Sequence, residues 1–369
     1  MANLPSQLGK MLHRIWEAPL QSIGLGGISA TSDLTIASCR DILDRRDVFQ
    51  AFDAQTGQPR WQILQACLGE MDYGRGPRAT PLILDDVVIL LGAFGHLHCV
   101  KRANGLTVWK KDLVKEYDAP LPTWGFSGTP LFVDNKIIVQ IGSRVANLVA
   151  LDLATGKELW RSGIQPIAYS SFVYCEPAGK AQVIGYDEKS VGGWNVHTGE
   201  RLWTITPENS GDFNVPTPIV RDDSLWLISE NNGLRRYEFK DGIAQPTPVA
   251  TSPDLLPDSH TPVLIGDRIY VAYEGLHAVD AMTLENLWSS DADHFMGYAS
   301  LIGSDDKLLV LTQSGSLTLL DITQPVPKEL GSVSLGADID FQSHPAICDG
   351  KLFVRVGKSL SCFDLHQIN

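Results

Sequence analysis

The sequence predicts an all-β fold, namely an eight-bladed β-propeller built from four-stranded antiparallel blades. Three observations lead to this prediction. An eleven-residue segment recurs with its Asp, Gly and Trp in step, the copies follow one another at intervals of about 41 to 51 residues, and polar turns separate short apolar runs throughout the chain. That interval is the period of a four-stranded propeller blade.

The recurring segment runs from Ala51 to Trp61 and is repeated almost residue for residue from Ala150 to Trp160. Weaker copies end at Trp109, Trp203 and Trp288, and three further units keep only an acidic residue. The anchor position of the eight units is occupied in turn by Asp53, Lys101, Asp152, Asn195, Glu238, Asp280, Asp321 and Asp364.

Each unit has the same internal order, which the second unit illustrates. We expect its strands at about 79–84, 87–93, 96–102 and 107–112. The first strand follows a Thr-Pro pair, Asp and Asn residues form the next turn, and the third strand ends at the anchor. A Thr-Gly or Asn-Gly hairpin then leads into the fourth strand, which opens near the Trp.

The two ends of the chain are predicted to close the ring. The eighth unit reaches Asn369 before a fourth strand can form, and Arg14 to Ala18 resembles the opening of such a strand. A strand at about 13–20 is therefore expected to complete the last blade, which leaves no open sheet edge. Residues 1–369 then form a single domain, and the only helix expected is a short one near residues 3–12.

Six tryptophans are predicted to be structural. A large ring at one fixed place in each blade can fill the wedge between neighbouring blades, where it buries on the order of 150–250 Å². The tryptophans assigned to this docking role are Trp16, Trp61, Trp109, Trp160, Trp203 and Trp288.

Composition excludes several classes of function. The formal net charge is −13 and the sequence pI is about 5.1, which argues against nucleic acid or an anionic membrane as a partner. The six cysteines include no C-x-x-C pair, so free thiols are expected. No stretch of 18 apolar residues and no signal peptide are visible, which predicts a cytoplasmic monomer without a transmembrane segment, or a periplasmic or exported protein if a leader was removed.

The D-x-x-T-G-x-x-x-W repeat resembles that of the PQQ-like (quinoprotein-type) eight-bladed β-propeller family, in particular its BamB-like branch, over about residues 13–365. That family contains quinone-cofactor dehydrogenases and non-enzymatic interaction propellers, so the fold does not choose the function. The resemblance to the enzymes would imply a vicinal disulfide over the cofactor, a Trp beneath it, Ca²⁺ held by Glu and Asn, and a catalytic Asp. No two cysteines are adjacent here, and Trp124 is the best placed tryptophan for such a floor.

Loops that precede the first strand of each blade converge on one mouth of the central channel, where propellers usually bind partners. The residues next to those strands form a polar ring that also contains Ser127, and longer loops at 71–78, 122–126 and 291–298 add aromatic and basic side chains. Such residues are common at binding hot spots, although the alternative that they only plug the channel stays open. The predicted binding residues are Tyr73, Arg75, Arg78, Trp124, Tyr169, Asn214, His260, Tyr298 and His344.

No catalytic or metal site is predicted. Acidic and imidazole side chains map to the same mouth without a recognised ligand spacing, and these are Asp212, Asp258, Asp291, Asp293, Asp338, Asp340, His260, His294 and His344. His96 and His98 flank a strand and are interpreted as packing or edge residues. The sequence thus favours a non-catalytic scaffold that binds a protein, peptide or small ligand and has no cofactor. The alternative is an oxidoreductase dependent on PQQ and Ca²⁺.

Overall fold

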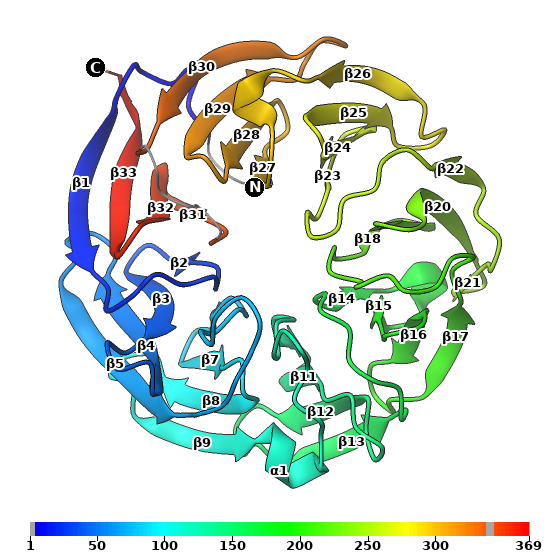
Figure 1. The fold of residues 1–369 in the computed structure, drawn as a ribbon. Helices are drawn as coiled ribbons and strands as arrows, with labels where there is room; N and C mark the ends of the chain where they lie inside the picture. Colours follow the sequence, from blue (N-terminus) through cyan, green and yellow to red (C-terminus); the bar gives the residue numbers. More distant parts are fainter. Residues whose placement is uncertain (1–3, 337–342, 369) are drawn as a thin grey trace.

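Eight antiparallel sheets surround a central axis in the computed structural model, which describes residues 4–336 and 343–368 (Figure 1). We number the sheets as blades 1 to 8 in chain order. Seven of them have four strands and blade 5 has five. The predicted fold class, an all-β eight-bladed propeller, is confirmed.

The first four blades each run in sequence from the channel outwards. Blade 1 consists of β2 (Ser29–Ala30), β3 (Leu34–Arg40), β4 (Arg46–Asp53) and β5 (Pro59–Ala66). Blade 2 consists of β6 (Leu82–Ile83), β7 (Val87–Leu91), β8 (His96–Lys101) and β9 (Thr107–Asp112). Blade 3 consists of β10 (Leu131–Val133), β11 (Lys136–Gln140), β12 (Leu148–Asp152) and β13 (Glu158–Ser162). Blade 4 consists of β14 (Val173–Cys175), β15 (Gln182–Tyr186), β16 (Val191–Asn195) and β17 (Arg201–Ile205).

The last four blades include the two exceptions to this order. Blade 5 consists of β18 (Ile219–Arg221), β19 (Ser224–Ser229), β20 (Gly233–Lys240), β21 (Ile243–Ala244) and β22 (Ala250–Ser252), the last two both paired with β20. Blade 6 consists of β23 (Val263–Ile265), β24 (Arg268–Ala272), β25 (Leu276–Asp280) and β26 (Asn286–Ser290). Blade 7 consists of β27 (Ala299–Gly303), β28 (Lys307–Thr312), β29 (Ser316–Asp321) and β30 (Lys328–Ser334). Blade 8 consists of β31 (Ala346–Cys348), β32 (Lys351–Val356), β33 (Ser359–Ile368) and β1 (Leu12–Pro19).

Ring closure follows the prediction. Strand β1 pairs antiparallel with β33, with Trp16 opposite Cys362 and Pro19 opposite Ser359. The first segment of the chain thus supplies the outer strand of the last blade, and Figure 1 shows the blue β1 beside the red β33.

The predicted helix near residues 3–12 is wrong for the part that the structure describes. Residues 4–11 contain no helix, because Leu4 and Leu8 pack as an irregular segment on the apolar core of blades 7 and 8. The amide of Leu8 donates to the carbonyl of Leu330 at 3.0 Å, which fixes this segment against β30. The α-helix that does form is α1 (Leu113–Tyr117), capped by Asp112, and single 3₁₀ turns occur at Pro177–Gly179 and Asp293–Phe295.

Strand β6 is shorter than the 79–84 that the sequence predicts. Pro81 has no amide hydrogen to offer to a sheet, and the amide of Thr80 donates to Oγ1 of Thr129 in the next blade at 3.2 Å. The same link recurs from Thr129 to Ser171 and from Thr217 to Thr261. The first residues of the blades therefore tie neighbouring blades together around the channel.

The docking tryptophans fill the wedges between blades, as predicted. In four of the six, Nε1 of the ring donates to the carbonyl that follows the anchor of the next blade, at 3.1 Å for Trp16 and 2.8 Å for Trp61. Trp109 and Trp160 do the same at 2.8 and 3.0 Å. Each of these four rings also lies against the Gly of the next hairpin, such as Gly57 (φ +71°), where an added Cβ would come within 2.7 Å of Trp16. A glycine is needed there for both space and backbone conformation.

The boundary between blades 5 and 6 uses a different arrangement. Blade 5 has no tryptophan eight residues after its anchor, and Trp226 of β19 donates instead to the carbonyl of Ala281 at 2.7 Å. At the hairpin position where other blades have Gly, blade 6 has Leu284, which has φ +61° and is only 2% exposed. Its side chain packs in the same apolar cluster as Trp226. Trp203 is also indirect, because its Nε1 donates to Gln182, whose amide donates to Gly242 of blade 5.

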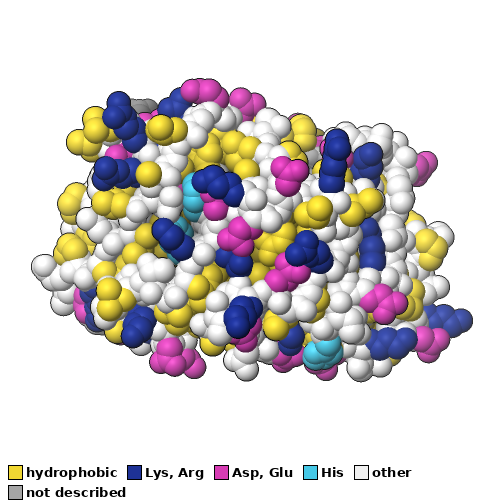
Figure 2. All heavy atoms as spheres, turned by 90° about the horizontal axis from the view of Figure 1, so that it is seen from below, with side chains coloured by type: hydrophobic (Ala, Val, Ile, Leu, Met, Phe, Trp, Pro, Cys, Tyr) yellow, Lys and Arg dark blue, Asp and Glu magenta, His cyan; other side chains and the backbone are white. Residues whose placement is uncertain are grey.

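The outside of the ring carries both signs of charge. Viewed edge-on from the side of β9 and β13, Lys, Arg, Asp and Glu side chains are interspersed among apolar ones (Figure 2). Among the described residues, none of the helices has the length and apolar character needed to cross a bilayer. The cysteines are unpaired thiols, four of them buried and two partly buried.

Candidate functional site: a cavity at the channel mouth

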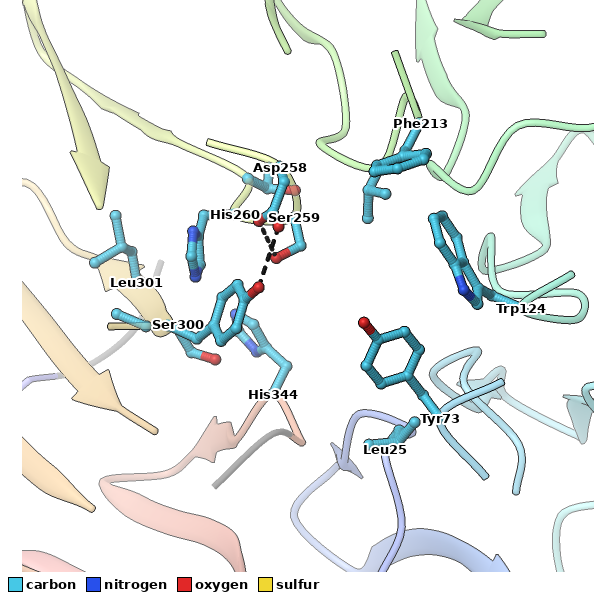
Figure 3. Close-up of a pocket in the computed structure, with 14 residues that line it drawn as sticks. Leu25, Tyr73, Trp124, Phe213, Asp258, Ser259, His260, Ser300, Leu301 and His344 are labelled. Carbon is cyan, nitrogen blue, oxygen red and sulfur yellow. Dashed lines mark hydrogen bonds between the residues drawn. The ribbon is translucent and has the colours of Figure 1, made fainter. Parts of the chain in front are cut away.

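A cavity with a volume of about 460 Å³ opens where the loops before the first strands converge (Figure 3). Its lining comes from seven of the eight blades, because each loop crosses from the outer strand of one blade to the inner strand of the next. The lining residues are Leu25, Tyr73, Trp124, Phe213, Val215, Asp258, Ser259, His260, Thr261, Tyr298, Ala299, Ser300, Leu301 and His344.

One side of the cavity is aromatic. Trp124 lies at its centre, with ring centroids 4.6 Å from Phe213, 4.8 Å from Tyr169 and 6.4 Å from Tyr73. The rings of Phe213 and Tyr73 meet it edge to face, at 78° and 64°, a favourable arrangement for aromatic pairs. These four residues, which we call the aromatic wall, come from the loops before blades 2, 3, 4 and 5.

The opposite side is polar and belongs to blades 6, 7 and 8. Asp258 accepts hydrogen bonds from Ser259 Oγ at 3.0 Å and from the Tyr298 hydroxyl at 3.1 Å. The ring of His260 packs on Tyr298 with centroids 4.9 Å apart, and Nδ1 of His344 lies 2.9 Å from the Pro345 carbonyl. We call Asp258, Ser259, His260, Tyr298 and His344 the polar wall.

The two histidines and the tyrosine of the polar wall are uncharged at neutral pH. Removal from water lowers the pKa of His260 and of His344, since burial disfavours the charged imidazolium. Burial and the neighbouring Asp258 raise the pKa of the Tyr298 hydroxyl. At neutral pH the histidines are therefore uncharged, and no Lys or Arg is among the residues that line the cavity.

Most of the predicted binding residues meet at this cavity. Tyr73, Trp124, His260, Tyr298 and His344 all line it. Tyr169 lies directly behind Trp124 as part of the aromatic wall, and its carbonyl accepts a hydrogen bond from Ser127 Oγ. This placement agrees with the prediction that the loops before the first strands converge on one mouth of the channel.

Arg75, Arg78 and Asn214 do not line the cavity. Arg75 forms ion pairs with Asp44 and Glu70 at the surface. The guanidinium of Arg78 donates to carbonyls of its own loop, those of Asp72, Gly74 and Gly76.

Asn214 is buried and has φ +56°. Its side-chain amide donates to the carbonyls of Asp187 and Glu188, while its own carbonyl accepts from the amides of Tyr169 and Ser170. The residue joins two neighbouring loops and shapes the mouth without facing the ligand space.

The sequence argument missed Phe213, Leu25 and Ser259. Phe213 precedes Asn214, and the left-handed backbone of Asn214 turns the chain there, so that Phe213 lies at the cavity and the asparagine in the interior. Asn adopts this conformation more readily than most residues. An aromatic residue next to such an Asn was the available signal.

The acidic and imidazole residues considered for a metal are dispersed. Asp212 accepts hydrogen bonds from Ser229, Asn231 and Asn232, and His294 lies 3.5 Å from Glu329 on the outer strand β30. Asp338 and Asp340 lie outside the described residues. Across residues 4–336 and 343–368, no group of three or more His, Cys, Asp or Glu side chains is placed to hold a metal ion. Trp194 and Trp226, also considered for an aromatic floor, are buried in the core.

Comparison with known proteins identifies the family. Residues 44–290 and 144–369 match the sequence profile described as outer membrane protein assembly factor BamB. The chain belongs to this BamB family. A solved structure of BamB from Moraxella catarrhalis superposes with a TM-score of 0.65 at 16% identity, covering 96% of this chain and 98% of that one.

Quinoprotein dehydrogenases share the fold of this BamB-family chain. The quinohemoprotein alcohol dehydrogenase ADHIIG from Pseudomonas putida HK5 superposes with a TM-score of 0.69 at 12% identity, covering all of this chain and 79% of that one. In sequence, the quinohemoprotein alcohol dehydrogenase of Comamonas testosteroni is 24% identical over 152 residues, and PedH of Pseudomonas putida is 28% identical over 177. These matches span 36% and 46% of this chain but only 20% and 26% of the dehydrogenases.

The residues of the cavity do not fit the quinone cofactor and Ca²⁺ of quinoproteins. Calcium needs six to eight oxygen ligands, whereas Asp258 is the one carboxylate that the described residues contribute to the lining. PQQ is a tricarboxylate, and the lining offers its negative charges no Lys or Arg. The thiols that would form a disulfide over it are separate free cysteines. The donor set of this BamB-family chain therefore matches neither group.

Proposed function

We propose that this BamB-family propeller is a non-catalytic binding module that receives a segment of a partner protein, or a small ligand, at the channel mouth. The observation that carries the proposal is the exposure of the aromatic wall. The side chain of Tyr73 is 81% exposed and that of Phe213 is 47% exposed, although aromatic residues usually bury most of their surface. Exposed aromatic residues around a concave site are typical of binding hot spots.

The surroundings of the cavity support a partner larger than the cavity itself. Ile42 and Leu43, in the turn between β3 and β4, and Leu68, in the loop before β6, are 81%, 66% and 74% exposed. In an antiparallel blade these turns and loops lie on the same face as the channel mouth. Exposed apolar side chains around a pocket mark an interaction surface.

The comparisons with known proteins also favour a binding module over an oxidoreductase. The family profile carries the description of an assembly factor, a kind of protein that acts through other proteins. The BamB structure also corresponds to this chain over nearly its full length, whereas the dehydrogenase ADHIIG extends beyond it. An oxidoreductase would in addition require the quinone and calcium ligands that the cavity does not provide.

A pair of tryptophan substitutions tests the proposal. Trp160→Ala removes a buried docking ring and is expected to lower the free energy of unfolding by about 3–5 kcal/mol. Trp124→Ala is expected to leave stability nearly unchanged and to weaken partner binding, because one side of its ring borders the open cavity. Urea unfolding measures the first quantity. Equal destabilisation by the two substitutions would contradict the role assigned to Trp124.

Partner contact is located by photo-crosslinking. A benzophenone amino acid at Tyr73 reports on the mouth, and the same group at Met282, 49% exposed on the hairpin between β25 and β26, reports on the opposite face. Adducts with a cellular partner are expected from position 73 and not from position 282. Adducts from position 282 alone would overturn the proposal, and a rise in the thermal unfolding midpoint that needs both PQQ and Ca²⁺ would favour the oxidoreductase.

A further inference from the structure

The cavity combines aromatic surface with negative charge. Figure 3 shows Tyr73, Trp124 and Phe213 on one side and Asp258 on the other, with the space between them open. Both oxygens of Asp258 accept hydrogen bonds from neutral hydroxyls, those of Ser259 and Tyr298, and no Lys or Arg of the described residues forms an ion pair with this carboxylate. Its charge is therefore stabilised by dipoles and is not cancelled by a basic side chain.

A second carboxyl group, that of Glu230, lies beside the aromatic wall. Glu230 accepts a hydrogen bond from the backbone amide of Phe213, which holds that ring at the mouth, and its other oxygen is buried without a partner. Burial, together with the nearby Asp212 and Asp258, raises the pKa of Glu230. Burial is the largest cause of this rise, and the negative charges of Asp212 and Asp258 add to it.

Two basic residues near the mouth, Arg78 and Arg235, do not line the cavity, although the charge of Arg78 acts on Tyr169 behind Trp124. Arg78 donates to three carbonyls of its own loop. Arg235 is buried and donates to Ser229, whose hydroxyl donates to Asp212, so one hydroxyl links this guanidinium to Asp212. Of the carboxylates around the cavity, Asp258 faces the ligand space.

We propose that the cavity binds a cation, namely an ammonium or guanidinium group carried on apolar carbon, between the aromatic wall and Asp258. This inference rests on the proposed function and specifies the chemistry of its ligand. Ring faces attract a cation through their quadrupole, most strongly at tryptophan, and a carboxylate without a basic partner adds Coulomb attraction. An anionic group would meet Asp258 without any compensating Lys or Arg.

The cation has two sources that share this chemistry. One is the Lys or Arg side chain of a partner segment that lies across the mouth, and the other is a free organic amine. A volume of about 460 Å³ is large enough for either, since small-molecule sites usually measure about 300–1,000 Å³. The probes are therefore choline and a short lysine peptide, each compared with a neutral molecule of the same shape.

The small-molecule arm compares choline with 3,3-dimethyl-1-butanol, in which carbon replaces the charged nitrogen. We expect choline to bind at least about tenfold more tightly at low salt, as measured by NMR titration. Asp258→Asn is expected to weaken choline about five- to tenfold and to leave the neutral alcohol unchanged. The matched control is Asp267→Asn in the same blade, whose side chain is 95% exposed in the turn between β23 and β24 and which should change neither affinity.

The peptide arm compares acetyl-Ala-Ala-Lys-Ala-Ala-amide with the same peptide carrying norleucine in place of lysine. Preference for lysine by about tenfold assigns the cation to a partner side chain, and choline binding without peptide binding assigns it to a free amine. Equal binding of the charged and neutral probes overturns the cation inference while leaving binding at the mouth intact. Absence of binding by all four probes overturns the inference, and loss of the Tyr73 crosslink as well would overturn the proposed function separately.

Discussion

His98 is an imidazole held in the interior of blade 2 with no hydrogen-bond partner for its Nε2 atom. It is only 4% exposed. Burial, assisted by the neighbouring His96 and Lys110, lowers its pKa from 6.5 to about 4. The folded protein therefore keeps this side chain neutral at pH values where the unfolded chain protonates it.

We therefore expect the free energy of unfolding to decrease as the pH is lowered from 6.5 towards 4. The contribution of His98 is fully present above pH 6.5 and is lost as the pH falls towards 4, because only the unfolded state gains the proton there. The loss is roughly 2–3 kcal/mol between pH 7.5 and 4.5. Urea unfolding of the native protein and of His98→Phe at both pH values measures the difference, and a variant with the same pH dependence as the native protein would contradict the assignment.

Residue identity at repeated positions was predictable, whereas side-chain direction at the mouth was not. Trp61 and Trp160 recur at the same place in matching segments, so one physical role explains both. Arg78 lies in a loop that reaches the mouth, but its long side chain turns back onto the carbonyls of that loop. No spacing in the sequence reveals whether such carbonyls are left without other donors.

At the scale of the hairpin, Leu284 of blade 6 occupies a position where most other blades have glycine. The hairpin needs φ +61° at this position, which ordinarily favours glycine. The preceding blade has no tryptophan at the repeat position, and the leucine side chain packs at 2% exposure in the same apolar cluster as Trp226 of β19. At this position the packing of the leucine side chain outweighs the preference of the backbone conformation for glycine.

Whether Leu284→Gly raises or lowers the free energy of unfolding tests that conclusion. Leu284→Gly is expected to lower the free energy of unfolding by about 2–3 kcal/mol, since loss of a buried leucine exceeds the gain from a relaxed backbone. Glu274→Gly is the control in the same blade, because Glu274 also has a positive φ of 46° but is exposed. The control should be neutral or slightly stabilising, and stabilisation by Leu284→Gly in urea unfolding would show that packing does not decide.

The elements themselves were predictable to the extent that each unit repeats. The strands of blade 2 begin and end within a few residues of their predicted bounds, because its turns carry Asp, Asn and Gly. Blade 5 was not predictable in the same way, since β20 is long enough to pair with both β21 and β22. The tryptophan that seals its wedge comes from β19, where no repeat marks it.

For the ring as a whole, closure depends on one strand from the far end of the chain. Removal of residues 1–20 would expose the backbone of β33 as an unpaired edge and uncover the wedge that Trp16 fills. We expect a lower thermal midpoint and self-association by edge pairing, measured by calorimetry and sedimentation. A peptide of residues 10–21 added in trans should restore the monomer, whereas its Trp16→Ala counterpart should not. A truncated chain with unchanged stability would contradict this account.

The pairing of β1 with β33 also sets an order of events in the cell. Pro19 leaves the ribosome long before its partner Ser359 and the rest of β33. At synthesis rates of about 5–20 residues per second, the nascent first strand waits roughly 20–70 s for its partner. During that delay blades 1 to 7 are able to form and to pack on one another in sequence. The strand β1, which contains Trp16, has no partner strand until β33 is made. The pairing of β1 with β33 is therefore the last step of folding. A chaperone that shields residues 12–19 during translation would act at this step.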